Sequence, residues 1–246
     1  MIHDSIAVLS DIHGNRWALE AVLEDIDKRG VETVFNLGDS LYGPLDPAGT
    51  AELLLRLNAT TVRGNEDRII VEDAESSPTL AYVREELAAR HFDFLKSLRV
   101  TESIGEQLLL FHGTPRDDAE YLVHDVGADG LRRRDETAIR RLLEGRPEEL
   151  FLCGHDHLPN VIELADNRTV VNPGSVGLPA YKDDYPFEHC VENGNPKARY
   201  CVVEKTNSGW LVAQLSVSYD HAAASDTAKK NGRDDWAYWL RTGLAK

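Results

Sequence analysis

The sequence has 246 residues, of which 42% are hydrophobic and 28% charged, so one large domain with a buried core is expected rather than a disordered chain. Its formal net charge of -15 disfavours duplex nucleic acid and anionic membranes as general partners, because binding to phosphate needs Lys and Arg. A small phosphorylated substrate stays open, since bound metal ions can supply positive charge locally.

Short apolar runs predict six buried strands, each of which ends at a polar loop. They cover residues 6–10, 33–37, 59–62, 107–111, 150–153 and 169–172. Helical patterns lie between them, over residues 16–29, 47–57, 80–97 and 136–144. This alternation is typical of an α/β fold with a parallel or mixed sheet. A further strand pair is expected at 198–203 and 210–217, joined by a turn.

Two regions depart from this alternation. Residues 179–197 are rich in Asp, Tyr, Pro, Asn and Gly and predict a long surface excursion. The segment after Tyr219 ends in a predicted short helix that carries Trp236 and Trp239, which either dock on the protein's own core or form a dimer contact. We therefore predict a main domain over residues 1–218 and a C-terminal tail over residues 219–246.

The cysteines and the N-terminal sequence indicate a cytoplasmic protein. Cys153, Cys190 and Cys201 form no CxxC motif, and no secretory leader pattern precedes the first strand, so unpaired thiols are expected. No apolar run approaches the roughly 18–20 residues that span a bilayer, so no membrane partner is expected.

Side chains able to bind metal follow five of the predicted strands. The loops read Asp11-Ile-His13, Gly38-Asp39, Arg63-Gly-Asn65, His112-Gly113 and Gly154-His155-Asp-His157. The carboxyl ends of strands in an open α/β sheet are where such folds bind ligands. We therefore expect the five loops to converge on one site.

The chemistry of these side chains predicts transition metals. The candidate ligands are two Asp, one Asn and four His, namely Asp11, His13, Asp39, Asn65, His112, His155 and His157. Such a set suits Mn first, and also Fe, Zn or Ni, and is a poor match to an all-oxygen calcium site or a closed, Cys-rich zinc site. Seven ligands exceed the need of one ion, so two divalent ions are predicted. A bridging Asp would hold them roughly 3.5–4 Å apart, the spacing used for in-line displacement at phosphorus.

Each of these residues also has an ordinary structural explanation. Asp11 alone is equally a helix cap, Asn65 alone is more often a turn residue, and His112 alone a packed core histidine. The site interpretation depends on coincidence, because five such loops occur in order at the ends of separate strands. The remaining histidines are expected on the surface or in packing contacts: His3, His91, His124, His189 and His221.

The ordered motifs resemble those of the calcineurin-like metallophosphoesterase family, which run DxH, GD, GN, GH and GHxH. The resemblance covers roughly residues 6–176 and includes the NPGS sequence at 172–175. It implies a four-layer α/β/β/α sandwich with mixed sheets, and makes residues 1–218 a catalytic domain. It also implies two metals bridged by Asp39. The first would be held by Asp11, His13 and His157, and the second by Asn65, His112 and His155.

One departure from the common family pattern concerns residue 66. Many members have GNHE at the third motif, where the His is thought to protonate the leaving group, whereas this chain reads Gly64-Asn65-Glu66-Asp67. The chain is more similar to the small bacterial and archaeal GNxD branch, which contains phosphodiesterases and diadenosine-tetraphosphatase-like hydrolases. The LYGP sequence at 41–44 and NPGSVG at 172–177 agree with that branch.

The sequence thus predicts a metal-dependent phosphohydrolase that cleaves phosphodiester or phosphoanhydride bonds of nucleotides by in-line attack of a metal-bridging hydroxide. Asp39, Asn65 and Asp67 are expected to act in catalysis. Asn15 and Arg63 are expected to hold phosphate oxygens, although Arg63 suits a strand-end salt bridge equally well. Asp67 or Glu66 would protonate the leaving group if burial raised its pKa, or Asp67 would orient a ligand, or no acid is needed.

Two other functions stay open. A phosphomonoesterase or protein phosphatase is disfavoured by the missing histidine, and a non-enzymatic scaffold by the presence of all seven ligand positions. The expected partner is a small phosphorylated substrate, and a homodimer through the tail is the alternative to a monomer. Substrate selectivity is expected to come from the loops at 42–46, 114–127 and 179–197.

Overall fold

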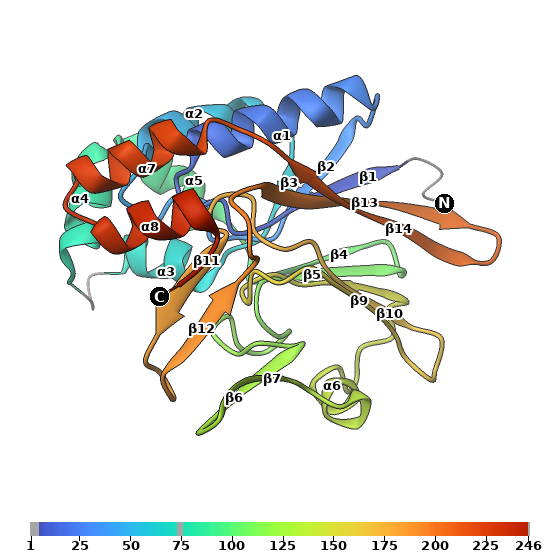
Figure 1. Cartoon of the computed structure of the whole chain (residues 1–246). Coiled ribbons are helices and arrows are strands. Elements are labelled where there is room, and N and C mark those ends of the chain that lie inside the picture. The colour runs from blue at the N-terminus through green and yellow to red at the C-terminus, as the bar shows by residue number, and fades with distance from the viewer. Residues whose placement is uncertain (1–4, 73–75, 246) are drawn as a thin grey trace.

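Two five-stranded sheets lie face to face in this computed structural model, which describes residues 5–72 and 76–245. Most of the helices cover the outer side of the first sheet, and one short helix with a β-hairpin lies beyond the second (Figure 1). The predicted four-layer α/β/β/α sandwich with mixed sheets is therefore confirmed.

The first sheet has the strand order β14-β13-β1-β2-β3. Its strands are β1 (Ile6–Leu9), β2 (Thr33–Asn36), β3 (Thr60–Thr61), β13 (Ala198–Thr206) and β14 (Gly209–Val217). β1 pairs in parallel with β2 and antiparallel with β13. The predicted pair of strands near the C-terminal end of the main domain is confirmed as the β13–β14 hairpin.

The second sheet has the order β4-β5-β8-β10-β9. Its strands are β4 (Thr101–Ile104), β5 (Leu108–Phe111), β8 (Leu150–Leu152), β9 (Asn160–Glu163) and β10 (Thr169–Asn172). β5, β8 and β10 run parallel in the middle. β4 and β9 are antiparallel edge strands that the sequence pattern did not predict, because their side chains are only partly buried.

Alternating side chains of the central strands belong to different cores. In β1, Ala7 and Leu9 pack under the helices, whereas Ile6 and Val8 pack between the sheets. β5 alternates in the same way between the sheet interface and the layer beyond the second sheet. Strands buried on both faces therefore read as continuous apolar runs in the sequence.

The helices on the side of the first sheet include one that was predicted wrongly. They are α1 (Arg16–Lys28), α2 (Pro47–Arg56), α3 (Asn65–Val71), α4 (Pro78–Glu86), α5 (Ala89–Ser97), α7 (His221–Lys230) and α8 (Asp234–Thr242). The single helix predicted over 80–97 is two helices, because Leu87 and Ala88 adopt extended backbone angles between α4 and α5. On the other side, α6 (Glu136–Leu142) packs against the second sheet beside the hairpin of β6 (His124–Gly127) and β7 (Gly130–Arg133).

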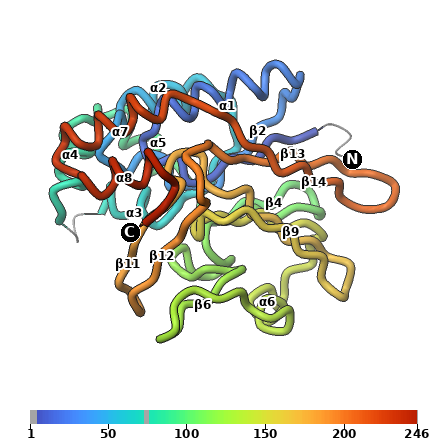
Figure 2. The backbone as a smooth tube through the Cα atoms, viewed as in Figure 1, coloured from blue at the N-terminus to red at the C-terminus, as the bar shows by residue number. Residues whose placement is uncertain are grey.

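The excursion and the tail are more ordered than predicted. Residues 179–197 contain a hairpin of β11 (Ala180–Asp183) and β12 (His189–Glu192), and the tail forms two helices instead of one. The end of the chain lies beside this hairpin, where the Ala245 amide donates to Glu192 (Figure 2). Trp236 and Trp239 are 3% and 7% exposed and pack on the protein's own core, as one of the two interpretations held. The domain boundary and the homodimer stay predictions.

Trp236→Ala is expected to lower the free energy of unfolding by about 3–5 kcal/mol, because it empties a buried indole site. Urea unfolding followed by circular dichroism measures this change. Tyr238→Ala on the same helix is the matched control, since Tyr238 is 38% exposed and its loss leaves no cavity. Equal midpoints for Trp236→Ala and Tyr238→Ala would contradict the docking of the tail.

Further predictions concern the cysteines, the histidines outside the motifs and membrane-spanning segments. The three cysteines are unpaired, as predicted. His91 contacts Glu52 at 2.7 Å and His124 contacts Asp156 at 2.7 Å, so both are packing residues, while His3 lies outside the described residues. Within residues 5–72 and 76–245, no helix has the length and apolar character needed to cross a bilayer.

Candidate metal centre

Parallel pairing of β1 with β2 sets the first two motif loops side by side. The amides of Asp11 and His13 donate to the carbonyls of Gly38 and Asp39, each at 3.0 Å. The loops are thus joined by backbone hydrogen bonds immediately after their strands, and Asp11, His13 and Asp39 lie together at the same edge of the sheet.

The second sheet brings its motif loops to the same place. His112 follows β5, and His155 and His157 follow β8, its parallel neighbour. The Gly154 amide donates to the His112 carbonyl at 2.8 Å, and the His155 amide donates to Asp11 Oδ2 at 3.1 Å. The loops of the two sheets therefore meet across the sandwich, which is the convergence expected from the sequence.

The ligand-type atoms form three overlapping groups. Asp11, His13 and His157 make one group, and Asp39, His112 and His155 a second, with the atoms of each within 4.8 Å of one another. A third group joins His13, Asp39 and Glu66. Asp39 belongs to the second and third groups, and the third shares His13 with the first, so Asp39 lies between the first and second groups, where a carboxylate could serve two ions.

Each of the four clustered histidines donates one ring N–H to a backbone carbonyl. The pairs are His13 Nδ1 with Tyr42 at 3.1 Å, His112 Nδ1 with Leu37 at 2.8 Å, His155 Nε2 with Ala119 at 3.0 Å, and His157 Nδ1 with Leu178 at 2.9 Å. A carbonyl only accepts, so the hydrogen of the neutral ring lies on that nitrogen and the other nitrogen carries none. In His13 and His157 these other nitrogens lie 3.0 Å apart within the cluster, where they could bind metal. This arrangement is the usual one for metal-binding histidines.

Unpaired buried atoms at the centre of the cluster test whether metal ions fit. Asp11 Oδ1, Asn65 Oδ1 and His112 Nε2 are shielded from solvent and make no hydrogen bond in the described part of the chain. The nearest ionisable neighbours of two of them are other candidate ligands, since His112 Nε2 lies 3.1 Å from Asp39 Oδ2 and Asp11 Oδ1 lies 3.3 Å from His157 Nε2. Leaving such an atom unsatisfied costs about 1–3 kcal/mol. Three of them in one cluster, all of types that bind transition metals, fit divalent ions.

The backbone is strained at five of the candidate ligands. Among the described non-glycine residues, six have left-handed backbone angles, and five of these are Asp11, His13, Asp39, His155 and His157. Each such residue costs about 1–3 kcal/mol, and strain of this kind collects at functional sites. The hydrogen bonds between the loops hold the ligands in these conformations.

Burial and neighbouring charges set the protonation of the acidic residues. Burial disfavours the charged form of Asp11 and Asp39, but His157 and His112 outweigh it and hold both pKa values below their ordinary range. Burial raises the pKa of Glu66 to about 7, although His13 Nδ1 lies 2.9 Å from Glu66 Oε2. Burial, assisted by the charge of Asp39, raises the pKa of Asp67 to about 6.

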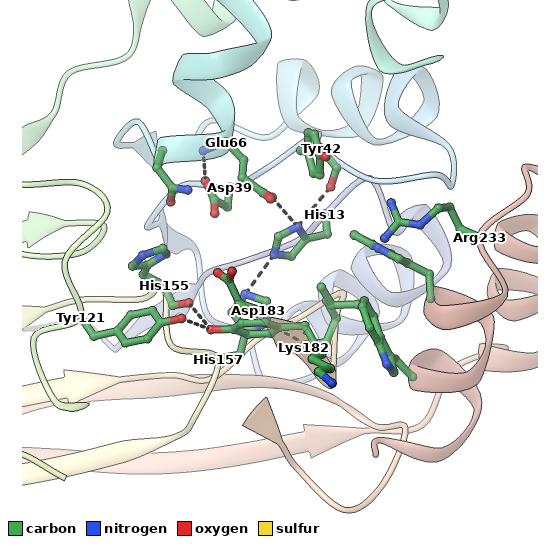
Figure 3. A pocket seen from close by; sticks show the side chains of 15 residues that line it. His13, Asp39, Tyr42, Glu66, Tyr121, His155, His157, Lys182, Asp183 and Arg233 are labelled. Atoms are coloured by element: carbon green, nitrogen blue, oxygen red, sulfur yellow. Dashed lines mark hydrogen bonds and ion pairs between the residues drawn. The ribbon is translucent and has the colours of Figure 1, made fainter. Parts of the chain in front are cut away.

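A cavity of about 210 Å³ opens above the cluster (Figure 3). His13, Asp39, Asn65, His155 and His157 line its floor. Its walls come from the three loops predicted to govern selectivity, through Tyr42, Tyr121 and Tyr181–Asp183, and from the tail, through Arg233, Trp236 and Trp239. Sequence reasoning missed the tail residues, because the amphipathic pattern around Trp236 indicates packing and says nothing of the surface on which it packs.

Three predicted site residues lie away from this cavity. Asn15 is fully buried; its Nδ2 donates to the Gly177 carbonyl and the Tyr219 hydroxyl, and its Oδ1 caps α1, so the structure disfavours the predicted phosphate contact. Arg63 is not among the lining residues, and its backbone amide donates to Arg99.

Asp67, the third of these residues, is buried beneath the loops. Its two oxygens accept from the amides of Ser40 and Gly64 at 2.9 and 3.1 Å. It therefore fastens the loop that carries Asp39 to the loop that carries Asn65, and does not reach the cavity.

The chain belongs to the calcineurin-like phosphoesterase superfamily, whose domain it matches over residues 5–191. It is 28% identical to the uncharacterized protein MJ0912 of Methanocaldococcus jannaschii over 96% of both chains. It is similar in structure to a metallophosphoesterase from Sphaerobacter thermophilus, with a TM-score of 0.74, 23% identity and coverage of 98% of this chain and 99% of that one. The hypothetical protein PH1004 from Pyrococcus horikoshii gives a TM-score of 0.72, 21% identity and coverage of 97% and 98%.

Proposed function

We propose that this phosphoesterase is a two-metal hydrolase that cleaves phosphodiester or phosphoanhydride bonds, with nucleotides as its substrates. The observation that carries the proposal is the cluster itself. Two buried carboxylates, one amide oxygen and four histidines, each held by a backbone carbonyl at one ring nitrogen, converge below a cavity. Three of their ligand atoms are buried and make no hydrogen bond in the described part of the chain. A scaffold without turnover would have no need of this strained and unsatisfied arrangement.

The groups in the structure support the assignment of ligands. Asp11, His13 and His157 would hold one ion, and His112 and His155, grouped with Asp39, the other. Asn65, whose Oδ1 is buried with no hydrogen-bond partner, would complete the second set, and Asp39 would contribute to both ions. Mn suits these donors first, and Fe, Zn or Ni are accepted by the same set. When bound, two such ions lower the pKa of a coordinated water and supply positive charge that stabilises the phosphate oxygens.

The residues around the ligands act by positioning them. Asp67 fixes the loops of Asp39 and Asn65, and Glu66 holds His13 at its Nδ1 side. Glu66 stands where many family members have histidine. Its carboxylate contacts the candidate ligand His13, so we assign it to positioning that ligand and not to protonating the leaving group. Substrates whose leaving groups depart without protonation, such as anhydrides and activated diesters, are therefore favoured over alkyl monoesters.

Metal removal is expected to abolish turnover, and Mn²⁺ is expected to restore it. The chelator-stripped protein is assayed with bis-p-nitrophenyl phosphate, p-nitrophenyl phosphate and diadenosine tetraphosphate, before and after Mn²⁺ is added. The preferred substrate then distinguishes a diesterase from a monoesterase and from an anhydride hydrolase. Bound metal without turnover on any of the three would contradict the proposal and support the scaffold.

A further inference from the structure

The cavity above the cluster continues past the candidate ligands into a second one. The second cavity has a volume of about 550 Å³, and it shares Asn65, Tyr121, His155 and Asp183 with the first. Figure 3 shows Tyr121 and His155 at one end of the first cavity and Arg233 at the other, so the second cavity adjoins the end away from the tail. Two of the candidate ligands, Asn65 and His155, therefore line the junction of a two-lobed cleft.

The geometry of in-line displacement determines how a substrate can lie at the junction of the two lobes. The attacking and leaving oxygens lie on opposite sides of the phosphorus, so a diester bound at the metals extends groups in two directions. A monoester has one organic group and would leave one lobe to water. Five candidate ligands line the first lobe, and two of them, Asn65 and His155, also line the second. A cleft of this shape thus fits a substrate with two arms, by which we mean the groups esterified on either side of the phosphorus.

The two lobes differ in chemistry. The first, which we call the aromatic lobe, has walls that include Tyr42, Tyr181, Trp236 and Trp239. The second, which we call the acidic lobe, also has tyrosine and histidine in its lining, but its charged residues are four carboxylates, of which the first lobe shares Asp183, and one guanidinium, namely Asp117, Glu120, Asp125, Asp183 and Arg134. Arg134 is already paired with Glu120 at 3.1 Å and Asp125 at 3.5 Å. Further phosphate groups would be repelled from the acidic lobe, whereas an uncharged or cationic group would be accepted.

We propose that the substrate is an asymmetric phosphodiester. It has an aromatic arm, a nucleoside or aryl group, in the aromatic lobe and an uncharged or cationic alcohol in the acidic lobe. This inference rests on the proposed hydrolase function and narrows it, because a dinucleoside polyphosphate would place phosphates in the acidic lobe. Selectivity then comes from β6, β11 and the loop before β6, which supply the acidic lobe with Val126, Asp183 and Glu120.

Val126→Trp tests whether the acidic lobe holds the second arm, because Val126 lines that lobe from β6 and an indole there would fill it. The kcat/KM for p-nitrophenyl phosphorylcholine should fall by about tenfold relative to that for p-nitrophenyl phosphate in the same preparation. The monoester rate reports folding and metal loading. Val161→Trp on β9 is the control, since Val161 is 41% exposed and lines neither lobe. An unchanged ratio in Val126→Trp would overturn the inference.

Glu120→Lys tests the charge of the acidic lobe. The kcat/KM for p-nitrophenyl phosphorylcholine should fall about tenfold relative to bis-p-nitrophenyl phosphate, because only the first has a cationic arm. Glu204→Lys, at an exposed position on β13, should leave this ratio unchanged. If turnover depends on metal but this ratio does not change in Glu120→Lys, the assignment of the two arms to the lobes is wrong, whereas the proposed function is unaffected. Absence of metal-dependent turnover on every ester would instead contradict the proposed function.

Discussion

Asp39→Asn is expected to lower metal-dependent turnover by about 10³-fold or more while the fold is retained. Asp39 belongs to two of the three groups of ligand-type atoms, and its Oδ2 lies 3.1 Å from His112 Nε2. The substitution removes one negative charge from the position that the proposed function assigns to both ions. Asn keeps an oxygen to accept from the Glu66 amide, which Asp39 Oδ1 does now at 2.8 Å, and it tolerates the left-handed backbone at this position.

The measurements are kcat/KM with bis-p-nitrophenyl phosphate, metal content per chain after dialysis, and thermal unfolding. Asp27→Asn, on the exposed face of α1, is the matched control and should behave as the wild type. Metal content should fall in Asp39→Asn, with a cooperative unfolding transition like that of the control. Wild-type turnover with two ions still bound would show that Asp39 does not bridge them.

The parts of the fold that the sequence predicts are those where burial leaves a clear periodic signal. β1 and β5 are buried on both faces and read as apolar runs. Edge strands β4 and β9, and the hairpin within residues 179–197, carry mixed side chains whose pairing depends on distant neighbours. The helix α3 was missed because its first residue, Asn65, was interpreted as the end of a motif loop.

The candidate site, like the fold, was predictable from the sequence only in part. Its ligand types follow strand ends and so are visible in sequence, and the structure brings all seven of them together. What orients them is not visible, since the carbonyl that holds His155 comes from Ala119 and the one that holds His157 comes from Leu178. Asn15 shows the opposite case: a polar residue beside a motif was interpreted as a substrate contact, whereas the structure buries it and engages its Nδ2 with Gly177 and Tyr219 and its Oδ1 in the cap of α1.

Gly64→Ala is expected to impair the site almost as severely as loss of Asp39, although it removes no ligand. A methyl group at residue 64 would lie 2.1 Å from Asp39 Oδ1 and 2.4 Å from the Asp39 backbone nitrogen. Gly64 has ordinary extended backbone angles, so the cost is steric and not conformational. The Asp39 loop must therefore move, and a displacement of about 1 Å at such a site can cost about 10²-fold in rate.

Turnover, Mn²⁺ affinity and thermal unfolding should all be measured. The steric clash displaces the candidate ligand Asp39 directly, whereas it affects the stability of the fold only through that displacement. Turnover should fall by about 10²-fold or more and the affinity for Mn²⁺ should weaken with it. Gly127→Ala is the matched control, since a methyl group there meets nothing within 4 Å and both variants add the same atoms. If Gly64→Ala kept wild-type turnover, the close contact between the loops of Asp39 and Asn65 would not set the geometry of the metal centre. Because backbone contacts hold Asp39 in place, the candidate centre depends on a residue that has no side chain as well as on the seven candidate ligands.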